Sequence, residues 1–236
     1  QRLERALVRA EAQASRAEAA AGFLRDLFVQ ADPDVHGGAP LPAADVLHQG
    51  AARLERIADP ALRAELEVVL GTAQLHLGDF ERASQRFARV LERSDGVDPN
   101  VRLAALQGMA GVLRESARYA EAETMQRDAL RAALRIGGDA EWSARLKLAE
   151  ILQAQDRPDE AEEALVGIER GAAAPALAGA VQLRLAGIAL GRGDASRGET
   201  RYRAALASFV EAYGAVHHET ARAHYGLAVA LHRLGR

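Results

Sequence analysis

Apolar residues recur at steps of three and four along most of the chain, and polar residues fill the positions between them. The stripe that shows this spacing most clearly consists of Leu66, Val69, Leu70, Ala73 and Leu77. Such spacing places the apolar side chains on one face of an α-helix. Gly78 ends this stripe, and a second stripe begins at Phe80 after a short polar turn. The pattern therefore predicts pairs of amphipathic helices that are joined by tight turns.

In four segments, a polar turn is followed by a predicted helix with a small residue near its start. They read GDFERASQRF, ARYAEAETMQ, DRPDEAEEAL and GDASRGETRY, and they align at Ala83, Ala122, Ala161 and Gly198, with spacings of 39, 39 and 37 residues. A period of roughly 20 to 50 residues with two helices per unit is typical of a helical solenoid, because no single unit can bury its own apolar face. We predict four such repeats and the first helix of a fifth.

Small residues also recur on the first helix of each repeat. They are Gly71, Ala110, Ala149, Ala186 and Ala228. Small side chains let two helices approach closely. We therefore expect these positions to contact the small residues of the second helices, so that each pair closes as an antiparallel hairpin.

Several of these residues resemble the tetratricopeptide (TPR) pattern. Leu70–Gly71 is followed by Gly78–Asp79–Phe80 and then by Ala83-x3-Phe87. The long period, the ARYAEAE and RPDEAEEAL turns and the HHETA segment at 217–221 are similar to the kinesin-light-chain type of this repeat. HEAT and armadillo repeats have similar lengths but lack this combination of turn and alanine. The resemblance implies an all-α solenoid of helical hairpins in a right-handed superhelix, preceded by a long N-terminal linker helix, and a protein-interaction module rather than an enzyme.

Residues 1–31 follow a different pattern, in which apolar residues alternate steps of four and three. The seam includes Leu3, Leu7, Leu24 and Phe28. Such a heptad seam can bind a second chain in a coiled coil. The alternative is a linker helix, or one that packs on its own first repeat. Residues 32–42 are a turn-rich connector that breaks the helix, and 43–236 form the predicted array.

The segments FLRDLFVQADPD and ADVLHQGAARLER, together with the repeats, resemble the region that follows the transmembrane segment in bacterial membrane-anchored Ser/Thr protein kinases. This resemblance implies a sensor module in the periplasm or another extracytoplasmic space. The alternative is a soluble cytoplasmic adaptor or assembly scaffold. The chain begins at Gln1 without methionine and stops halfway through a repeat, so we expect it to be part of a longer protein.

Composition supports the helical prediction and narrows the partners. Aromatic residues make up only 4% of the chain, and 49% of the residues are hydrophobic, which favours closely packed helices over a β-sandwich. The net charge of −3 gives no general attraction to nucleic acid. The absence of cysteine excludes disulfides and thiolate metal sites. No apolar run approaches the roughly 18–20 residues that cross a bilayer.

No motif predicts catalysis, a cofactor or a metal. Gly78–Asp79–Phe80 has the letters of a kinase motif in the wrong order, and no G-x-S-x-G segment occurs. The histidines near the end of the chain lack the spacing of a zinc pair. They are His217, His218, His224 and His232. We expect Glu160, Glu162 and Glu163 on a solvent-facing helix start, where they favour the helix dipole.

The TPR resemblance also implies that the outer face of the first helices lines a concave groove. The predicted groove residues are Gln107, Arg114, Lys147, Glu150, Gln153, Arg184, Arg222, Tyr225 and His232. Lys147, Arg184 and Arg222 make the later groove locally basic. We therefore predict a protein or peptide partner with acidic side chains or a free carboxylate. The alternative is that these are ordinary solvated cations.

Overall fold

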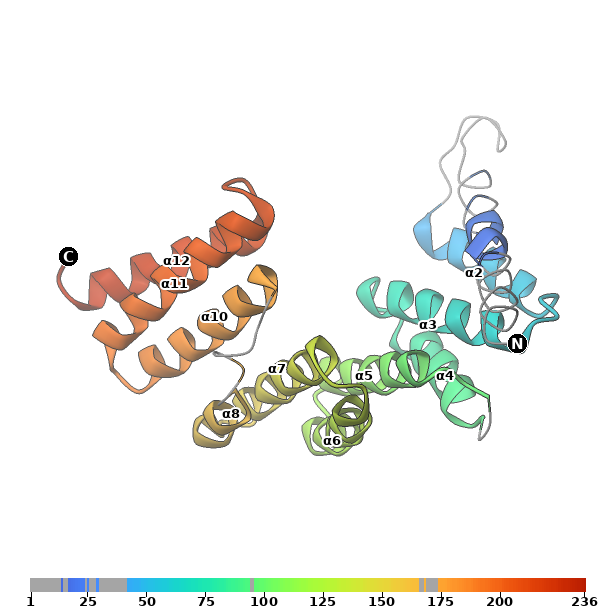
Figure 1. Ribbon diagram of the computed structural model, residues 1–236, viewed down its shortest axis with the longest axis horizontal. Helices are drawn as coiled ribbons and strands as arrows, with labels where there is room; N and C mark the ends of the chain where they lie inside the picture. Colours follow the sequence, from blue (N-terminus) through green and yellow to red (C-terminus); the bar gives the residue numbers. More distant parts are fainter. Residues whose placement is uncertain are drawn as a thin grey trace, which may run out of the picture. The chain divides into compact units, whose positions relative to one another are not determined.

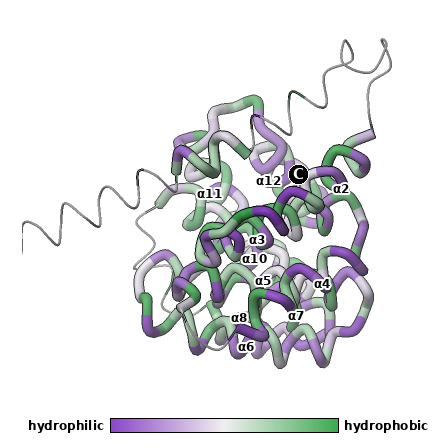
Figure 2. The backbone as a smooth tube through the Cα atoms, turned by 90° about the vertical axis from the view of Figure 1, so that its right-hand side faces the viewer, coloured by the Kyte–Doolittle hydropathy of each residue, from purple (hydrophilic) through white to green (hydrophobic). Residues whose placement is uncertain are grey.

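The computed structural model describes residues 14, 17–23, 25, 29, 42–93, 96–165, 168 and 174–236, and within these ranges every regular element is an α-helix (Figure 1). The all-α prediction is confirmed. The chain divides into two compact units, Gln1–Ser116 and Ala117–Arg236. Hydrophilic and hydrophobic stretches alternate along the helices of both units (Figure 2). Most of the helices therefore have an apolar face to bury against a neighbour, whereas α10 (Pro175–Gly191) is apolar around most of its circumference.

The first unit contains the helix pair of the first repeat, the helix before it and the first helix of the second repeat. Its labelled helices are α2 (Ala43–Leu54), α3 (Pro60–His76), α4 (Phe80–Leu91) and α5 (Pro99–Glu115). The side chain of Asp59 accepts a hydrogen bond from the Ala61 backbone N–H at 2.8 Å, which caps α3, and Pro60 occupies its first turn. Both features favour a helix start. The predicted stripes from Leu66 and Phe80 therefore correspond to α3 and α4.

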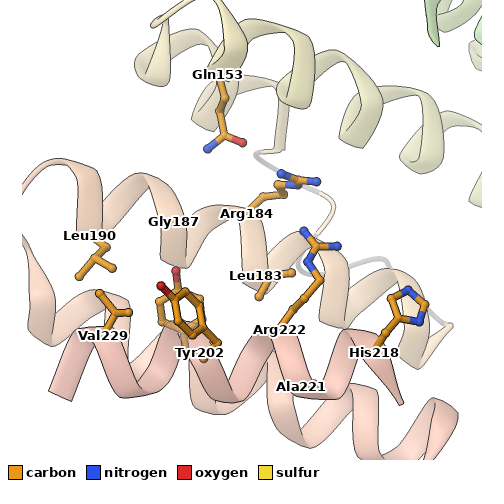
Figure 3. Close-up of a pocket in the computed structure, with 12 residues that line it drawn as sticks. Gln153, Leu183, Arg184, Gly187, Leu190, Tyr202, His218, Ala221, Arg222 and Val229 are labelled. Atoms are coloured by element: carbon orange, nitrogen blue, oxygen red, sulfur yellow. The ribbon is translucent and has the colours of Figure 1, made fainter. Parts of the chain in front are cut away.

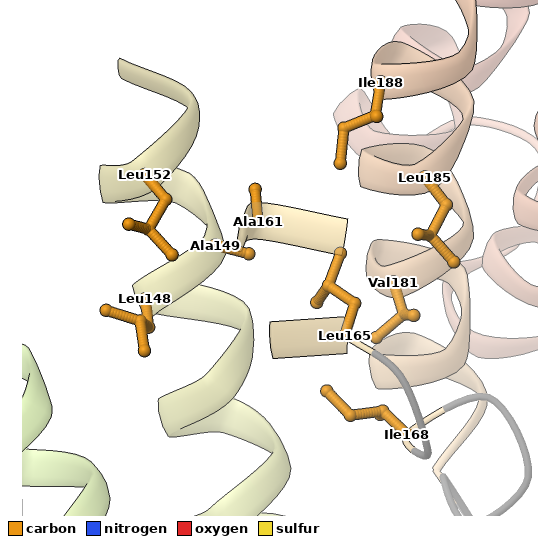
Figure 4. Close-up of a cluster of buried hydrophobic side chains, with 9 residues drawn as sticks. All are labelled: Leu148, Ala149, Leu152, Ala161, Leu165, Ile168, Val181, Leu185 and Ile188. Carbon is orange, nitrogen blue, oxygen red and sulfur yellow. The ribbon is translucent and has the colours of Figure 1, made fainter. Parts of the chain in front are cut away.

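The second unit continues the same alternation. Its helices are α6 (Tyr119–Ile136), α7 (Asp139–Ala154), α8 (Pro158–Leu165), α10 (Pro175–Gly191), α11 (Ala195–Tyr213) and α12 (His218–Arg233). Figure 4 shows Ala161 and Leu165 of α8 between α7 and α10. The core here joins three helices, because no pair can bury its apolar side chains alone.

The predicted small contacts lie at the centre of these pairs. Ala83, Ala122 and Ala161 are fully buried. The place that a Gly198 Cβ would occupy lies 3.6 Å from the Ala186 carbonyl oxygen of the facing helix. At Gly198 the predicted close contact between small residues of the two helices of a pair is therefore confirmed.

Aromatic rings add a contact between successive repeats. The Phe87 ring of α4 lies against both Gly71 and Gly108, and a Cβ at Gly108 would overlap it. The Tyr202 ring of α11 occupies the same register and lies against Gly226 of α12, where a Cβ would again overlap the ring. Both second-helix rings therefore require a glycine on the next first helix.

The four large residues of the N-terminal seam lie outside the described residues, whereas the neighbouring Phe23 is described. Phe23 is buried against Leu54, Leu62 and Leu66 of the first unit. This contact supports the alternative in which the N-terminal helix packs on its own chain. Dimerisation through the seam residues stays a prediction. Those residues are Leu3, Leu7, Leu24 and Phe28.

A glutamate directly after the aligned small residue pairs with the turn of the following repeat. Glu123 accepts hydrogen bonds from Arg157 and, at 2.9 Å, from the Gln155 side chain. Glu199 pairs in the same way with Arg236 at 2.8 Å. These contacts join one second helix to the next turn, so they fix the spacing between neighbouring repeats.

The expectation for the start of α8 is wrong for one of its three glutamates. Glu160 and Glu163 are exposed, but the side chain of Glu162 is only 23% exposed and pairs with Arg192 and, at 2.7 Å, with Arg197. Glu162 therefore binds the following repeat. The interaction depends on two arginines that lie about 30 residues later in the chain.

The turn that follows the first helix of each repeat contains one residue with a positive φ. The residues are Gly78, Ala117, Asp156, Gly193 and Gly235. At Ala117 φ is 58° and at Asp156 it is 59°. A side chain in this left-handed region costs roughly 1–2 kcal/mol. The fold therefore imposes a glycine-like conformation on two residues that are not glycine.

We predict that Ala117→Gly raises the free energy of unfolding by about 0.5–1 kcal/mol, since relief of the strained φ outweighs the extra freedom of glycine in the unfolded chain. Ala204→Gly, in the exposed middle of α11, is the matched control and should lower it by a similar amount. Urea denaturation measures both. A loss of stability in Ala117→Gly would contradict the proposed strain.

We also predict that Glu123 stabilises the fold in a pH-dependent way. Burial raises the pKa of this carboxyl, but hydrogen bonds from Gln155, Arg127 and Arg157 outweigh burial and lower the pKa to about 2. Because the folded pKa lies below the unfolded value of about 4.3, the stabilisation is complete above that value and is lost as the pH falls toward 2.

The measurement is urea denaturation of the wild type and Glu123→Gln at several pH values from 2 to 7. The variant should be less stable by about 1 kcal/mol or more at neutral pH, and the difference should shrink below about pH 4. Glu211→Gln, at an exposed position, should stay within about 0.5 kcal/mol of the wild type throughout. A Glu123→Gln difference that does not change with pH would contradict the assignment.

Candidate functional site

A pocket of about 630 Å³ opens in the second unit between α7, α10, α11 and α12. Most of its lining comes from α10 and α12, which are the first helices of successive repeats. Its size falls within the range of about 300–1,000 Å³ that ligand pockets usually have. Figure 3 shows side chains from these helices pointing into a common space.

One end of the pocket is apolar. Leu190, Val229 and the ring of Tyr202 gather there (Figure 3). Gly226 lies over the same ring and cannot carry a side chain without overlap, and Gly187 of α10 also faces the pocket. The two glycines leave open the space that larger residues would fill.

The other end carries arginines whose charges are already balanced. Arg184 pairs with Glu150 at 2.6 Å, and Arg222 pairs with Glu219 at 2.9 Å. Figure 3 shows the two guanidinium groups on the same side of the pocket. His218 lies beside them, 3.4 Å from Glu219. The locally basic groove predicted from the sequence is therefore neutralised by carboxylates at these two arginines.

The Tyr202 hydroxyl is the polar group of the apolar end. Tyr202 is 7% exposed, and none of the described residues forms a hydrogen bond with its hydroxyl. Burial raises the pKa of the phenol above its usual value, and the positive charge of Arg233 offsets part of that rise. The hydroxyl therefore stays protonated at neutral pH and can both donate and accept a hydrogen bond.

The structure brings together only part of the predicted groove. Gln153, Arg184, Arg222 and Tyr225 line the pocket, and Glu150 contributes as the partner of Arg184.

The other predicted groove residues lie elsewhere. Lys147 and His232 are exposed but are not among the residues that line this pocket. Gln107 and Arg114 lie on α5 in the first unit, where Arg114 pairs with Glu115 at 2.6 Å. They do not belong to this site.

Sequence reasoning missed Tyr202 as a site residue, because it lies in the apolar stripe of its helix. Its counterpart in the first repeat is Phe87, four residues after the aligned alanine. The available signal was a hydroxyl at a position where the first repeat has a purely apolar ring. A polar aromatic residue at a core position needs a partner for its hydroxyl.

A second cleft, in the first unit, is a weaker candidate. It lies between α2 and α4 and includes Arg86 and Arg89. Arg86 is buried and donates to Glu67 at 2.6 Å and to Gln74 at 2.8 Å. Arg89 also pairs with Glu67, at 3.3 Å. These arginines stabilise the α3–α4 pair, so their role is structural.

The described part of the chain contains no cluster of three histidine, aspartate or glutamate side chains that could hold a metal ion. None of its helices is long and apolar enough to span a bilayer.

Comparison with known proteins identifies the fold. No protein-family model matches the chain, and no curated protein sequence matches it significantly. BtubC (BKLC) from P. vanneervenii has a similar structure, with a TM-score of 0.64 and 20% identity over 80% of this chain and 82% of that one. The TPR-like repeats described as those of a kinesin light chain from Podosopora anserina give a TM-score of 0.58 and 18% identity over 76% and 90%.

The chain thus has the fold of TPR-like repeat proteins. The predicted likeness to repeats of the kinesin-light-chain type is confirmed at the level of fold.

Proposed function

We propose that this chain is a non-catalytic protein-interaction module that holds a peptide segment of a partner in the pocket between α10 and α12. The observation that carries the proposal is the pocket itself, which combines an apolar end with two arginines on successive first helices. Fold-level similarity to TPR-like repeats supports the same class of function, because stacked helical hairpins offer extended binding surfaces.

The chemistry of the pocket favours a peptide that carries an apolar side chain beside a carboxylate. Arg184 engages Glu150 through one terminal nitrogen, and Arg222 engages Glu219 through one terminal nitrogen. A guanidinium has five N–H donors, so each arginine retains donors for a ligand carboxylate. Glu150 and Glu219 hold the arginine side chains in place, which lowers the entropy cost of binding.

Binding of such a peptide in the pocket requires only a modest affinity. A micromolar complex needs about −8 kcal/mol. One buried apolar anchor and two charge-assisted hydrogen bonds can supply most of that free energy.

For the parent protein, we propose the extracytoplasmic sensor region of a membrane-anchored bacterial Ser/Thr kinase. The support is the sequence resemblance of the segments before the repeats and of the repeats themselves. Sequencing the reading frame upstream of Gln1 tests this. A kinase domain followed by an apolar span of about 20 residues agrees with it, whereas a start codon close to Gln1 would favour the soluble cytoplasmic adaptor.

We predict that the double variant Arg184→Gln/Arg222→Gln loses peptide binding. Two fluorescein-labelled octapeptide pools serve as probes, each with a central aromatic or leucine residue flanked either by Asp and Glu or by Lys and Arg. Fluorescence anisotropy should show tighter binding of the acidic pool to the wild type. The variant should bind that pool at least about tenfold more weakly, a loss of about 1.4 kcal/mol or more.

The matched control is Arg131→Gln/Arg135→Gln, which makes the same charge change on α6 outside the pocket. It should bind like the wild type. Glutamine avoids placing like charges beside Glu150 and Glu219, and circular dichroism should show unchanged helicity in both variants. Undiminished binding by the pocket variant would rule out the arginines as the anion site.

A further inference from the structure

The hydroxyl of the largely buried Tyr202 faces a pocket instead of a protein partner. Tyr202 is more than nine-tenths buried, it lines the pocket, and no described residue hydrogen-bonds to its hydroxyl. The hydroxyl opens into the pocket, so a ligand group placed there can form a hydrogen bond with it. A phenylalanine, like Phe87 in the first repeat, would fill the same space without offering that hydrogen bond.

Two glycines keep this hydroxyl accessible. The ring is held by its contact with Gly226, where a Cβ would overlap it. The hydroxyl points toward Gly187. A Cβ added at Gly187 would lie 4.0 Å from the hydroxyl oxygen, which is the nearest heavy atom in the other described helices. A side chain at Gly187 would lie in van der Waals contact with the hydroxyl and narrow its access from the pocket.

Apolar side chains form part of the wall beside the hydroxyl. Leu190 and Val229 lie on the same side of the pocket as Tyr202 (Figure 3). A ligand group that reaches the hydroxyl must therefore be largely apolar along its length and polar at its end. The side chain of tyrosine has this form, whereas phenylalanine and leucine lack the polar end.

We propose that Tyr202 is a specificity-determining residue that selects a ligand side chain with a hydrogen-bonding group at its tip, and that the preferred anchor of the bound peptide is a tyrosine. This inference rests on the proposed function and names its ligand more closely. The ligand phenol exchanges a hydrogen bond with the Tyr202 hydroxyl, while its ring packs on Leu190 and Val229. An acidic residue beside the anchor reaches the arginines at the other end.

A pair of peptides that differ by one oxygen atom tests the inference. The probes are fluorescein-labelled Ala-Asp-Tyr-Asp-Ala-NH2 and the same peptide with phenylalanine in place of tyrosine. The wild type should bind the tyrosine peptide about tenfold more tightly, because a site built to hydrogen-bond a hydroxyl discriminates against the analogue that lacks it. Tyr202→Phe keeps the ring against Gly226 and should bind the two peptides with equal affinity.

A second pair of variants separates a binding role from a structural one. Gly187→Ala places a methyl group over the hydroxyl, so it should weaken binding of the tyrosine peptide and lower its advantage over the phenylalanine peptide. Gly191→Ala makes the same change on the same helix where no heavy atom lies within 4 Å, and it should leave both affinities unchanged. Both variants should be at least as stable as the wild type, because alanine is the better helix former.

Each outcome is informative. Equal affinities of the two peptides for the wild type, or a tyrosine preference that persists in Tyr202→Phe, would overturn this inference and leave the proposed function standing. Failure of both peptides to bind the folded wild type, together with failure of the acidic octapeptide pool, would overturn the proposed function and this inference with it.

Discussion

The contact of an aromatic ring with the backbone of the next helix determines how closely successive repeats pack. Phe87 lies against Gly108 in the first unit, and Tyr202 lies against Gly226 in the second. In each case the ring belongs to a second helix and the glycine to the first helix that follows. The ring occupies space that any side chain would need, so the two helices approach only where that residue is glycine. In the second unit, the same contact forms the floor of the candidate pocket.

Where the second helix lacks a ring, the residue opposite is a long cation. When the repeats are aligned, Gln126 and Leu165 occupy the position of Phe87 and Tyr202 on the second helix. Lys147 and Arg184 occupy the position of Gly108 and Gly226 on the first helix that follows. Gln126 is buried and donates to the Ala144 carbonyl at 2.8 Å. The aromatic–glycine contact thus occurs at the first and the last of these four positions, and a cation occupies the two between them. The pocket lies where Arg184 from one such position meets Tyr202 and Gly226 from the next, which explains its apolar and charged ends.

The helices and their period could be predicted from sequence because both depend on local spacing of apolar and small residues. The burial of Ala83, Ala122 and Ala161 follows directly from that spacing. Other features were beyond prediction because they depend on distant partners. Glu162 is adjacent in sequence to exposed glutamates, and only the turn of the next repeat supplies its arginines. The strained turn at Ala117 was also hidden, since the residue itself gives no sign of a positive φ.

The candidate site could likewise be predicted from the sequence only in part. Residue spacing and the TPR resemblance selected Gln153, Arg184, Arg222 and Tyr225, which line the pocket, but also Lys147 and His232, which do not. The pairing of Arg184 with Glu150 could not be foreseen, because these residues lie 34 positions apart on two different helices. Arg222 and Glu219 are an i,i+3 pair on one helix. The apolar spacing around Tyr202 indicates that its ring is buried, but it gives no sign that the hydroxyl faces a pocket.

The free energy of unfolding of Gly226→Ala tests most directly whether the ring contact controls packing. Alanine favours an isolated helix over glycine by about 1 kcal/mol, so helix propensity alone predicts a gain. If α12 approaches the Tyr202 ring as closely as the structure indicates, the added methyl must displace the ring, and urea denaturation should show a net loss of about 1–3 kcal/mol. A variant that is more stable than the wild type would show that the helices do not meet at this glycine, and the explanation of both the repeat packing and the pocket would be wrong.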